Sequence, residues 1–320
     1  DRKKIKSQNT IDNLTWAIDK QIIPAIGRRR LRDLDCENVE DMLADMAATG
    51  MSTSSLIRIH TTLTRALKWA QSRGKILRNV SDLVETPLGT QRPSIEFTVA
   101  QVGRILLTAK GSRLEALWIL GFVLGMRPGE LTGLRWDNVD LDTGVISILE
   151  SLKSHAGKLS QGSTKTKQSR RKLKALPIAI TALKAHQERQ QADRLAAGAW
   201  WTDTGYVFTS EVGTPINPAN LRRAFRALVK AADIPAKQPT EDIPDPGQWH
   251  PNEMRHSAGS YMDHMGIPRE RIADILGHKG TRTTEEVYIH PQEVIDMTSP
   301  AFEAYGNQFG NQPAEGETER

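Results

Sequence analysis

The segment between Thr86 and Thr98, TPLGTQRPSIEFT, divides the sequence into two parts. It holds two prolines and one glycine with few apolar residues, a composition that is typical of a linker between domains. The chain of 320 residues is long enough for two ordinary domains, each with its own core. We therefore predict a first domain over residues 1–86, a linker over 87–97, a second domain over 98–300 and a C-terminal tail over 301–320.

The first domain is predicted to be entirely helical, because apolar residues recur there at helical spacing. Four helices are expected, over residues 11–22, 38–48, 52–74 and 80–85. The first ends at Pro24 and Gly27, and the third, which is the clearest, can be capped by Ser52 and ends at Gly74. The apolar stripe of this third helix comprises Leu56, Ile59, Leu63, Leu67 and Ala70. Its other faces carry basic residues, namely Arg58, Arg65, Lys68 and Arg73.

The second domain is predicted to be mainly α with a small antiparallel β-sheet. Thr98 can cap a first helix, and the nearly all-apolar run from Leu114 to Leu124 is expected to form a helix in the core. The β-branched run at 145–149 predicts a strand, and residues 173–178 can supply its antiparallel partner. Further helices are expected near 179–196, 217–232, 253–265 and 268–276.

Several classes of protein are excluded by what the sequence lacks. One cysteine, Cys36, cannot form a disulfide within the chain, and no Cys/His set at zinc-ligand spacing follows it. The longest apolar run is too short to span a bilayer, and the charged N-terminal segment is unlike a signal peptide. We therefore expect a soluble protein of the cytoplasm with no membrane partner.

Signatures of nucleotide and metal chemistry are also missing. The segment that starts at Gly157 has Ser163 where an ATP-binding loop carries lysine, and neither GxGxxG nor GxSxG occurs. The histidines between His250 and His290 lack acidic or cysteine partners at ligand spacing, and the aspartates at 137, 140 and 142 lie in an expected turn. We expect no metal site and no cofactor.

Basic residues are concentrated in one tract. Residues 151–181 contain eight lysines and arginines and no acidic residue, whereas the whole chain has a net charge of only +5. Such a tract indicates a polyanionic partner, although a solvated loop is an alternative interpretation of the charges alone.

Four residues on predicted elements have side chains suited to phosphate chemistry: Arg127, Arg255, His278 and Tyr288. Arg127 directly precedes Pro128, which suits the first position of a helix, and the N-terminus of a helix favours an anion. Each residue has an ordinary alternative. Arg127 can pair with Glu130, Arg255 with Glu253 or Asp263, His278 can cap a helix, and Tyr288 can lie at an amphipathic rim.

Taken together, four motifs resemble those of the tyrosine recombinases, the phage integrase family. They are GMRPGELTGLRWDNVDLDTGVISI, the TKTKQSRR hairpin, PNEMRHSAGSYMDHMG and ILGHKGTRTTEEVYIH, in that order along the chain. The resemblance covers residues 10 to 300 and is greatest to integrases of actinobacterial mobile elements. Residues 10–86 are similar to the core-binding domain of that family. The chain begins at Asp1 and does not include the additional arm-binding domain that many integrases carry. We therefore expect it to be a fragment or a processed form.

The resemblance implies a catalytic role for five residues. Arg127 and Arg255 would clamp the scissile phosphate, and Tyr288 would attack the phosphorus to form a 3′-phosphotyrosyl link without ATP or metal. Lys165 would protonate the leaving 5′-oxygen, with Lys167 as the alternative donor. His278 would hydrogen-bond the phosphate and help to orient Tyr288.

One position departs from the family pattern. Many members carry histidine three residues before the second arginine, whereas this chain has Asn252. An amide can donate a hydrogen bond to phosphate but does not titrate near neutral pH, so we expect Asn252 to bind phosphate rather than act as a base. His250 is an alternative base, while His256 is expected to be structural.

The resemblance also implies an architecture and partners. The two domains would close as a C-shaped clamp around double-stranded DNA at the core recombination site, with four protomers on two duplexes in association with the nucleoid. An accessory DNA-bending or directionality factor is a further implied partner. DNA contacts are expected from Lys167, Arg170, Arg171, Arg58 and Arg65. The segment with Val294, Ile295, Met297, Phe302 and Tyr305 would dock on a neighbouring protomer or pack in cis.

Two alternative functions remain open from the sequence. A type IB topoisomerase shares phosphotyrosine chemistry and relaxes DNA as a monomer. A catalytically inactive DNA-binding regulator would keep the basic surfaces without cleavage.

Overall fold

The computed structural model describes residues 8–89, 96–155, 158–163, 170–238, 247–277 and 294–296. These residues form two compact units: the described part of 1–93 belongs to the first, and most of the described residues from 96 onward belong to the second. Within these ranges, no helix combines the length and the apolarity that crossing a bilayer requires.

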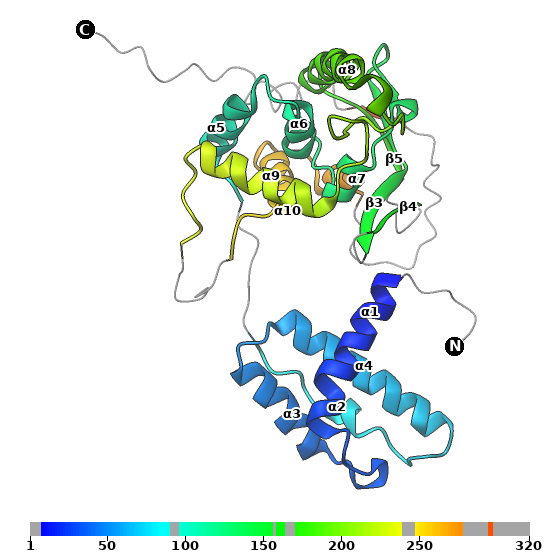
Figure 1. The fold of residues 1–320 in the computed structure, drawn as a ribbon. Helices are drawn as coiled ribbons and strands as arrows, with labels where there is room; N and C mark the ends of the chain where they lie inside the picture. The colour runs from blue at the N-terminus through cyan, green and yellow to red at the C-terminus, as the bar shows by residue number, and fades with distance from the viewer. Residues whose placement is uncertain are drawn as a thin grey trace. The chain divides into compact units, whose positions relative to one another are not determined.

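The first unit is helical, as predicted (Figure 1). Its helices are α1 (Gln8–Ala17), the π-helical turn η1 (Ile18–Ile22), α2 (Ile23–Ile26), η2 (Leu31–Asp33), α3 (Cys36–Ala48), α4 (Thr53–Ser72) and η3 (Val80–Leu83). The helix over 80–85 is thus a 3-10 helix. Pro24 does not end the first helical segment, because it lies in the first turn of α2, where its missing N–H costs little.

The core of the first unit forms where the periodicity predicts it. All five residues of the α4 stripe, from Leu56 to Ala70, are buried, and the first four lie in one apolar cluster with Val39 and Leu43 of α3. α3 begins two residues earlier than expected, because the Asp35 carboxylate accepts a hydrogen bond from the backbone of Asn38 (2.8 Å). Ser52 lies at the N-cap of α4, but its hydroxyl bonds the Ser55 hydroxyl (3.0 Å) rather than a backbone amide.

The helices of the second unit surround one apolar helix (Figure 1). They are α5 (Val99–Ala109), α6 (Glu115–Val123), α7 (Pro128–Thr132), η4 (Trp136–Asn138), α8 (Pro177–Ala197), η6 (Gly198–Trp200), α9 (Pro218–Ala231), α10 (Asn252–His264) and α11 (Arg269–Leu276). α6 packs against α5, α7, α8 and α10 and is buried from Ala116 to Val123, which confirms the predicted core helix. Thr98 caps α5 in a reciprocal capping box with Gln101.

Phe97 corrects the predicted linker at its C-terminal end. This residue is fully buried in the second unit, stacks on Trp249 with ring centroids 4.1 Å apart, and donates its backbone N–H to the Ser257 hydroxyl (2.9 Å). Phe97 therefore belongs to the core of the second unit rather than to the linker.

The strands form two small sheets. The larger has the order β1 (Val139–Asp140), β2 (Val145–Ile148), β5 (Arg171–Lys174) and β6 (Val294–Asp296); β3 (Glu150–His155) and β4 (Lys158–Ser163) pair separately as an antiparallel hairpin. β2 and β5 pair antiparallel, as predicted. The strand after the basic tract lies at 171–174 rather than 173–178, because Pro177 already begins α8.

β6 adds a parallel edge to the larger sheet. Val294 lies opposite Lys172 and Ile295 opposite Leu173, so this part of the C-terminal segment pairs in cis. The other predicted docking residues, Met297, Phe302 and Tyr305, lie outside the described residues. The fold class predicted from the sequence is confirmed, with this parallel pair as an addition.

Candidate active site

Arg127 occupies the N-cap of α7, with Pro128 at the first helical position, as the sequence predicts. The N-terminus of α7 is already capped by a carboxylate of the chain, since Glu130 Oε2 accepts the backbone N–H of Arg127 (3.0 Å). The guanidinium of Arg127 donates from Nη1 to Glu130 Oε1 (2.7 Å) and from Nη2 to the carbonyl of Gly277 (2.9 Å). The expected ion pair with Glu130 therefore exists, but the side chain is still 37% exposed and has a second partner.

Arg255 lies in the first turn of α10 and is buried. Its Nη1 donates to the carbonyl of Gly125 (2.9 Å) and its Nη2 to the carbonyl of Leu276 (2.5 Å). The alternative partners considered from the sequence are occupied elsewhere, because Glu253 pairs with Lys237 and Asp263 with Arg269. Arg255 is thus held by backbone carbonyls, which fix the position of the guanidinium without neutralising its charge.

The two arginines meet at the C-terminal end of α11. Leu276 ends this helix and Gly277 follows in the left-handed conformation (φ 63°), and their carbonyls accept from Arg255 and Arg127 respectively. The C-terminus of a helix carries partial negative charge, which favours cations. Gly125 is needed on the opposite side, since its φ is 58° and a Cβ there would lie 2.4 Å from Leu276.

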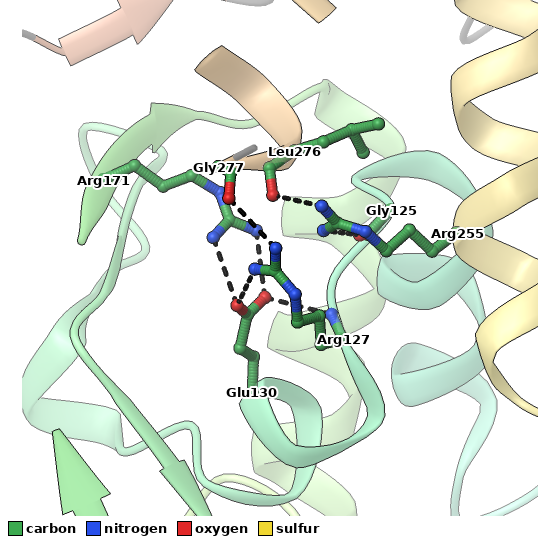
Figure 2. A network of polar contacts seen from close by, with 7 residues as sticks. All are labelled: Gly125, Arg127, Glu130, Arg171, Arg255, Leu276 and Gly277. Atoms are coloured by element: carbon green, nitrogen blue, oxygen red, sulfur yellow. Dashed lines mark hydrogen bonds and ion pairs between the residues drawn. The ribbon is translucent and has the colours of Figure 1, made fainter. Parts of the chain in front are cut away.

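A third arginine completes the group. Arg171, the first residue of β5, is buried and contacts both carboxylate oxygens of Glu130, with Nη2 3.0 Å from Oε2 and Nη1 3.4 Å from Oε1. Figure 2 shows that the side chains of Arg127, Arg171 and Arg255 converge from three different elements around Glu130 and the end of α11. We call Arg127, Arg171, Arg255 and Glu130 the arginine cluster.

The charges of the arginine cluster shift the pKa values of its members. Burial by itself would raise the pKa of the Glu130 carboxyl, but Arg171 and Arg127 hold it below its ordinary value. Burial, and then the charges of Arg127 and Arg171, lower the pKa of Arg255 to about 9. Three guanidinium groups against one carboxylate leave an excess of positive charge, so the arginine cluster is suited to bind an anion.

Asn252 and His250 lie at the start of α10. Asn252 is the first residue of the helix and is exposed, and its backbone N–H donates to His250 Nδ1 (3.1 Å). Burial lowers the pKa of His250, and Arg222, Arg226 and Lys237 lower it further. A neutral His250 with Nδ1 as an acceptor carries its proton on Nε2.

The structure brings together two of the five predicted catalytic residues, Arg127 and Arg255. The others, Lys165, His278 and Tyr288, lie outside the described residues, as does the alternative donor Lys167. Gly277, whose carbonyl binds Arg127, is the residue directly before His278 in the sequence.

The residues predicted to contact DNA differ in exposure. Arg58 and Arg65 are exposed on α4, and Arg170 is exposed just before β5. Arg171 is 3% exposed in its side chain and is paired with Glu130, so it does not offer its guanidinium to DNA at the surface. The prediction for Arg171 is corrected: it is a buried member of the arginine cluster.

Sequence reasoning missed the role of Glu130 and Arg171, although both carry a signal. Glu130 is three residues after the N-cap of α7, the position from which a glutamate caps its own helix. Arg171 is two residues before Leu173 and four before Ala175, which are both buried, and this period of two places the arginine on the core side of the strand.

The described residues contain no group of three or more His, Cys, Asp and Glu side chains that could hold a metal ion. Asp140, one of the three neighbouring aspartates, instead forms a turn, since its Oδ1 accepts from the backbone of Asp142 (3.0 Å) and Thr143 (2.9 Å).

Comparison with known families shows that residues 96–294 match the model of the phage integrase family. An integrase of Streptomyces ambofaciens is 39% identical over 295 residues, which cover 88% of this chain and 71% of that relative. A tyrosine recombinase XerC-like protein of Caldanaerobacter subterraneus is 26% identical over 260 residues, 75% of this chain and 63% of that protein.

Solved structures show the same fold. The Tn1549 transposon integrase in complex with transposon right end DNA superposes with a TM-score of 0.73 at 18% identity, covering 87% of this chain and 88% of that chain. A lambda integrase tetramer bound to a Holliday junction superposes with a TM-score of 0.61 at 19% identity, covering 88% of this chain and 72% of that chain.

Proposed function

Since this chain belongs to the phage integrase family of tyrosine recombinases, we propose that it is a site-specific DNA recombinase whose arginine cluster binds the phosphate to be cleaved. The observation that carries the assignment of the site is the convergence of Arg127 and Arg255 on the end of α11, one residue before His278. This arrangement joins three motifs that are far apart in the sequence.

The geometry of the two guanidinium groups supports phosphate binding. Among the described residues, Arg127 and Arg255 each use two N–H contacts to hold their positions, which leaves further N–H groups on each for a ligand. Negative charge on the non-bridging oxygens increases as the phosphorus becomes five-coordinate. Fixed cations that need no reorganisation stabilise this transition state more than the ground state.

The covalent step is assigned to Tyr288. Its phenol oxygen loses its proton to solvent and attacks the phosphorus, a bond from tyrosine to the 3′-phosphate forms, and the bond from phosphorus to the 5′-oxygen breaks. The leaving oxygen takes its proton from Lys165, with Lys167 as the alternative donor, while His278 hydrogen-bonds the phosphate. Attack by a 5′-hydroxyl of another strand reverses these steps, so the phosphotyrosyl bond conserves the energy needed for rejoining.

The wider assembly is part of the same proposal. Residues 1–86 would act as the core-binding domain and 97–300 as the catalytic domain, which close together on DNA across the linker at 87–96. A tetramer on two duplexes is supported by the lambda integrase structure, which is a tetramer bound to a Holliday junction. An accessory DNA-bending or directionality factor and an association with the nucleoid are further parts of this proposal.

A trapping experiment tests the proposal. DNA fragments from the element that encodes the protein are incubated with it, the covalent complexes are isolated under denaturing conditions, and the attached DNA is sequenced to find the core site. A nicked suicide duplex with that site, from which the cleaved end diffuses away, should then accumulate a covalent complex with the wild type and none with Tyr288→Phe. Absence of a complex, or equal trapping by the variant, would refute the catalytic assignment.

The same preparation distinguishes recombination from relaxation. We expect strand exchange between two duplexes that carry the core site. Relaxation of a supercoiled plasmid that lacks the site, without any strand exchange between paired sites, would favour a topoisomerase instead.

A further inference from the structure

The buried ion pair between Arg171 and Glu130 takes no direct part in the cleavage steps above, yet Glu130 also contacts Arg127. The side chain of Arg171 is 3% exposed and that of Glu130 is 2% exposed, whereas that of Arg127 is 37% exposed. Glu130 thus contacts one arginine that faces solvent and one that does not. A phosphate that enters from solvent meets Arg127 first and does not reach Arg171.

We propose that Arg171 is a positioning residue for DNA cleavage: it holds the carboxylate of Glu130, so that the positive charge of Arg127 remains available to the scissile phosphate. The proposal rests on the function proposed above. It assigns a role within the active site to a residue that does not touch the reacting atoms.

The charge balance of the arginine cluster supports this role. Glu130 is needed to orient Arg127, because its two oxygens bind both the backbone N–H and the guanidinium of that residue. Without Arg171, however, Glu130 and Arg127 would form a neutral pair, and Arg255 alone would supply the excess charge. Arg171 adds a second excess charge, so that Glu130 can orient Arg127 without cancelling the attraction for phosphate.

The location of Arg171 makes this arrangement rigid. β5 lies between β2 and β6 in the larger sheet, and Arg171 lies opposite Ile148 of β2. The planar guanidinium faces both carboxylate oxygens, which fixes the orientation of Glu130 as well as its charge. A lysine at the same place would keep the charge but could not match both oxygens in this way.

Stability alone is a weak explanation for the pair. Desolvation of two buried charges offsets most of their attraction, and replacing such a pair with neutral groups is often close to neutral for folding. A positioning role and a structural role therefore predict different results when both charges are removed together.

The experiment measures single-turnover cleavage of the nicked suicide duplex at saturating protein, together with DNA binding and thermal unfolding. The variants are Arg171→Met, Arg171→Lys, Glu130→Gln and the double variant Glu130→Gln/Arg171→Met. Arg189→Met is the matched control, because Arg189 forms an Arg–Glu ion pair with Glu115 (2.9 Å) in the same unit, outside the arginine cluster.

We expect Arg171→Met to cleave about 100-fold more slowly than the wild type, the size of effect seen when one transition-state contact is lost, while its affinity for the duplex changes less than threefold. The double variant restores the net charge of the arginine cluster and should cleave about tenfold faster than Arg171→Met. Arg171→Lys should lie between Arg171→Met and the wild type, and Arg189→Met should cleave at the wild-type rate.

Two results would overturn the inference. One is a folded Arg171→Met that cleaves as fast as the wild type, and the other is a folded double variant that is no faster than Arg171→Met. If Arg171→Met does not fold, the comparison moves to the polar, uncharged variant Arg171→Gln, for which a wild-type rate has the same meaning. Failure of the wild type itself to form a covalent complex would instead reject the proposed function.

Discussion

The arginines of α4 and those of the arginine cluster illustrate two different uses of the same side chain. Arg58 and Arg65 are exposed in the first unit, and neither side chain has a hydrogen-bond or ion-pair partner among the described residues. Arg255 and Arg171 are buried in the second unit and bound to carbonyls or to a carboxylate. Hydrated cations can follow a DNA backbone at little desolvation cost, whereas the fixed ones are held in advance at the expense of solvation.

This difference separates affinity from rate. Exposed arginines add counterion-dependent binding that is similar for the ground state and the transition state, so we expect those of α4 to contribute to the affinity for DNA. Buried arginines in a fixed geometry are stronger where new charge develops, so we expect those of the arginine cluster to contribute to the rate of cleavage. Each prediction below tests whether a residue affects the affinity for DNA, as its exposure indicates, or the rate of cleavage, as its burial indicates.

The largest effect is expected for Arg255→Ala. This variant removes a buried guanidinium and leaves the carbonyls of Gly125 and Leu276 without their partner. We expect single-turnover cleavage of the suicide duplex to fall about 1,000-fold, while affinity measured by fluorescence anisotropy changes only a few-fold. An equal loss of affinity and rate would place Arg255 with the exposed class, and a near-normal rate would remove it from the active site.

A simple anion should reveal the excess charge of the arginine cluster in the absence of DNA. Burial and the charges of Arg127 and Arg171 lower the pKa of Arg255 to about 9. Arg255 therefore stays charged at neutral pH, but its charge is less favourable in the folded protein than in water and reduces the stability of the fold, a cost that a bound anion can offset. Sulfate at ten times its dissociation constant should stabilise the fold by about 1.4 kcal/mol.

The measurement is the unfolding temperature in sulfate against chloride at equal ionic strength. The wild type should gain about 3 °C, Arg255→Met should lose most of this gain, and the Arg189→Met control should keep it. The same increase in the wild type and in Arg255→Met would show that sulfate binds elsewhere.

Smaller effects are expected on α4. Arg58→Ala and Arg65→Ala should each weaken DNA binding several-fold and reduce the slope of log affinity against log salt by about 1, with no change in cleavage rate at saturation. Arg73→Ala is the matched control, because Arg73 is the C-cap residue of the same helix and its guanidinium carbon lies over the Trp69 ring, 5.5 Å from the ring centroid. A fall in the saturated rate for Arg58→Ala would contradict the division between affinity and rate.

Local sequence pattern was sufficient to predict the helices and the position of Arg127. The stripe on α4, the capping of α5 by Thr98 and the Arg127-Pro128 helix start all depend on residues within one or two turns of each other. Their physical causes are therefore contained in short stretches of the sequence.

The partners of the arginines could not be predicted in this way. Arg255 is held by the carbonyls of Gly125 and Leu276, and every residue type carries a carbonyl, so no side chain marks these positions. Glu130 and Arg171 are 41 residues apart and meet only in the folded second unit, where the side chain of Arg171 on β5 reaches the carboxylate of Glu130 on α7. The basic character of the tract at 151–181 favoured a surface role for Arg171, whereas the alternation of buried and less buried residues along β5 places its side chain on the buried face of the strand.

Asn252 tests the division between exposed residues that set affinity and buried residues that set rate, since it is exposed and yet lies three residues before the buried Arg255. If its carboxamide only donates a hydrogen bond to phosphate, Asn252→His should cleave within about threefold of the wild type, because an imidazole can donate in the same way. Asn252→Ala removes the donor and should be about tenfold slower, the cost of roughly one hydrogen bond to a charged group. A much faster Asn252→His with a new acidic limb near pH 6 would show that a titrating group at this position improves on the amide. If Asn252→His is inactive while Asn252→Ala retains activity, the site excludes the larger imidazole by size, and a hydrogen bond from this position is not needed for cleavage.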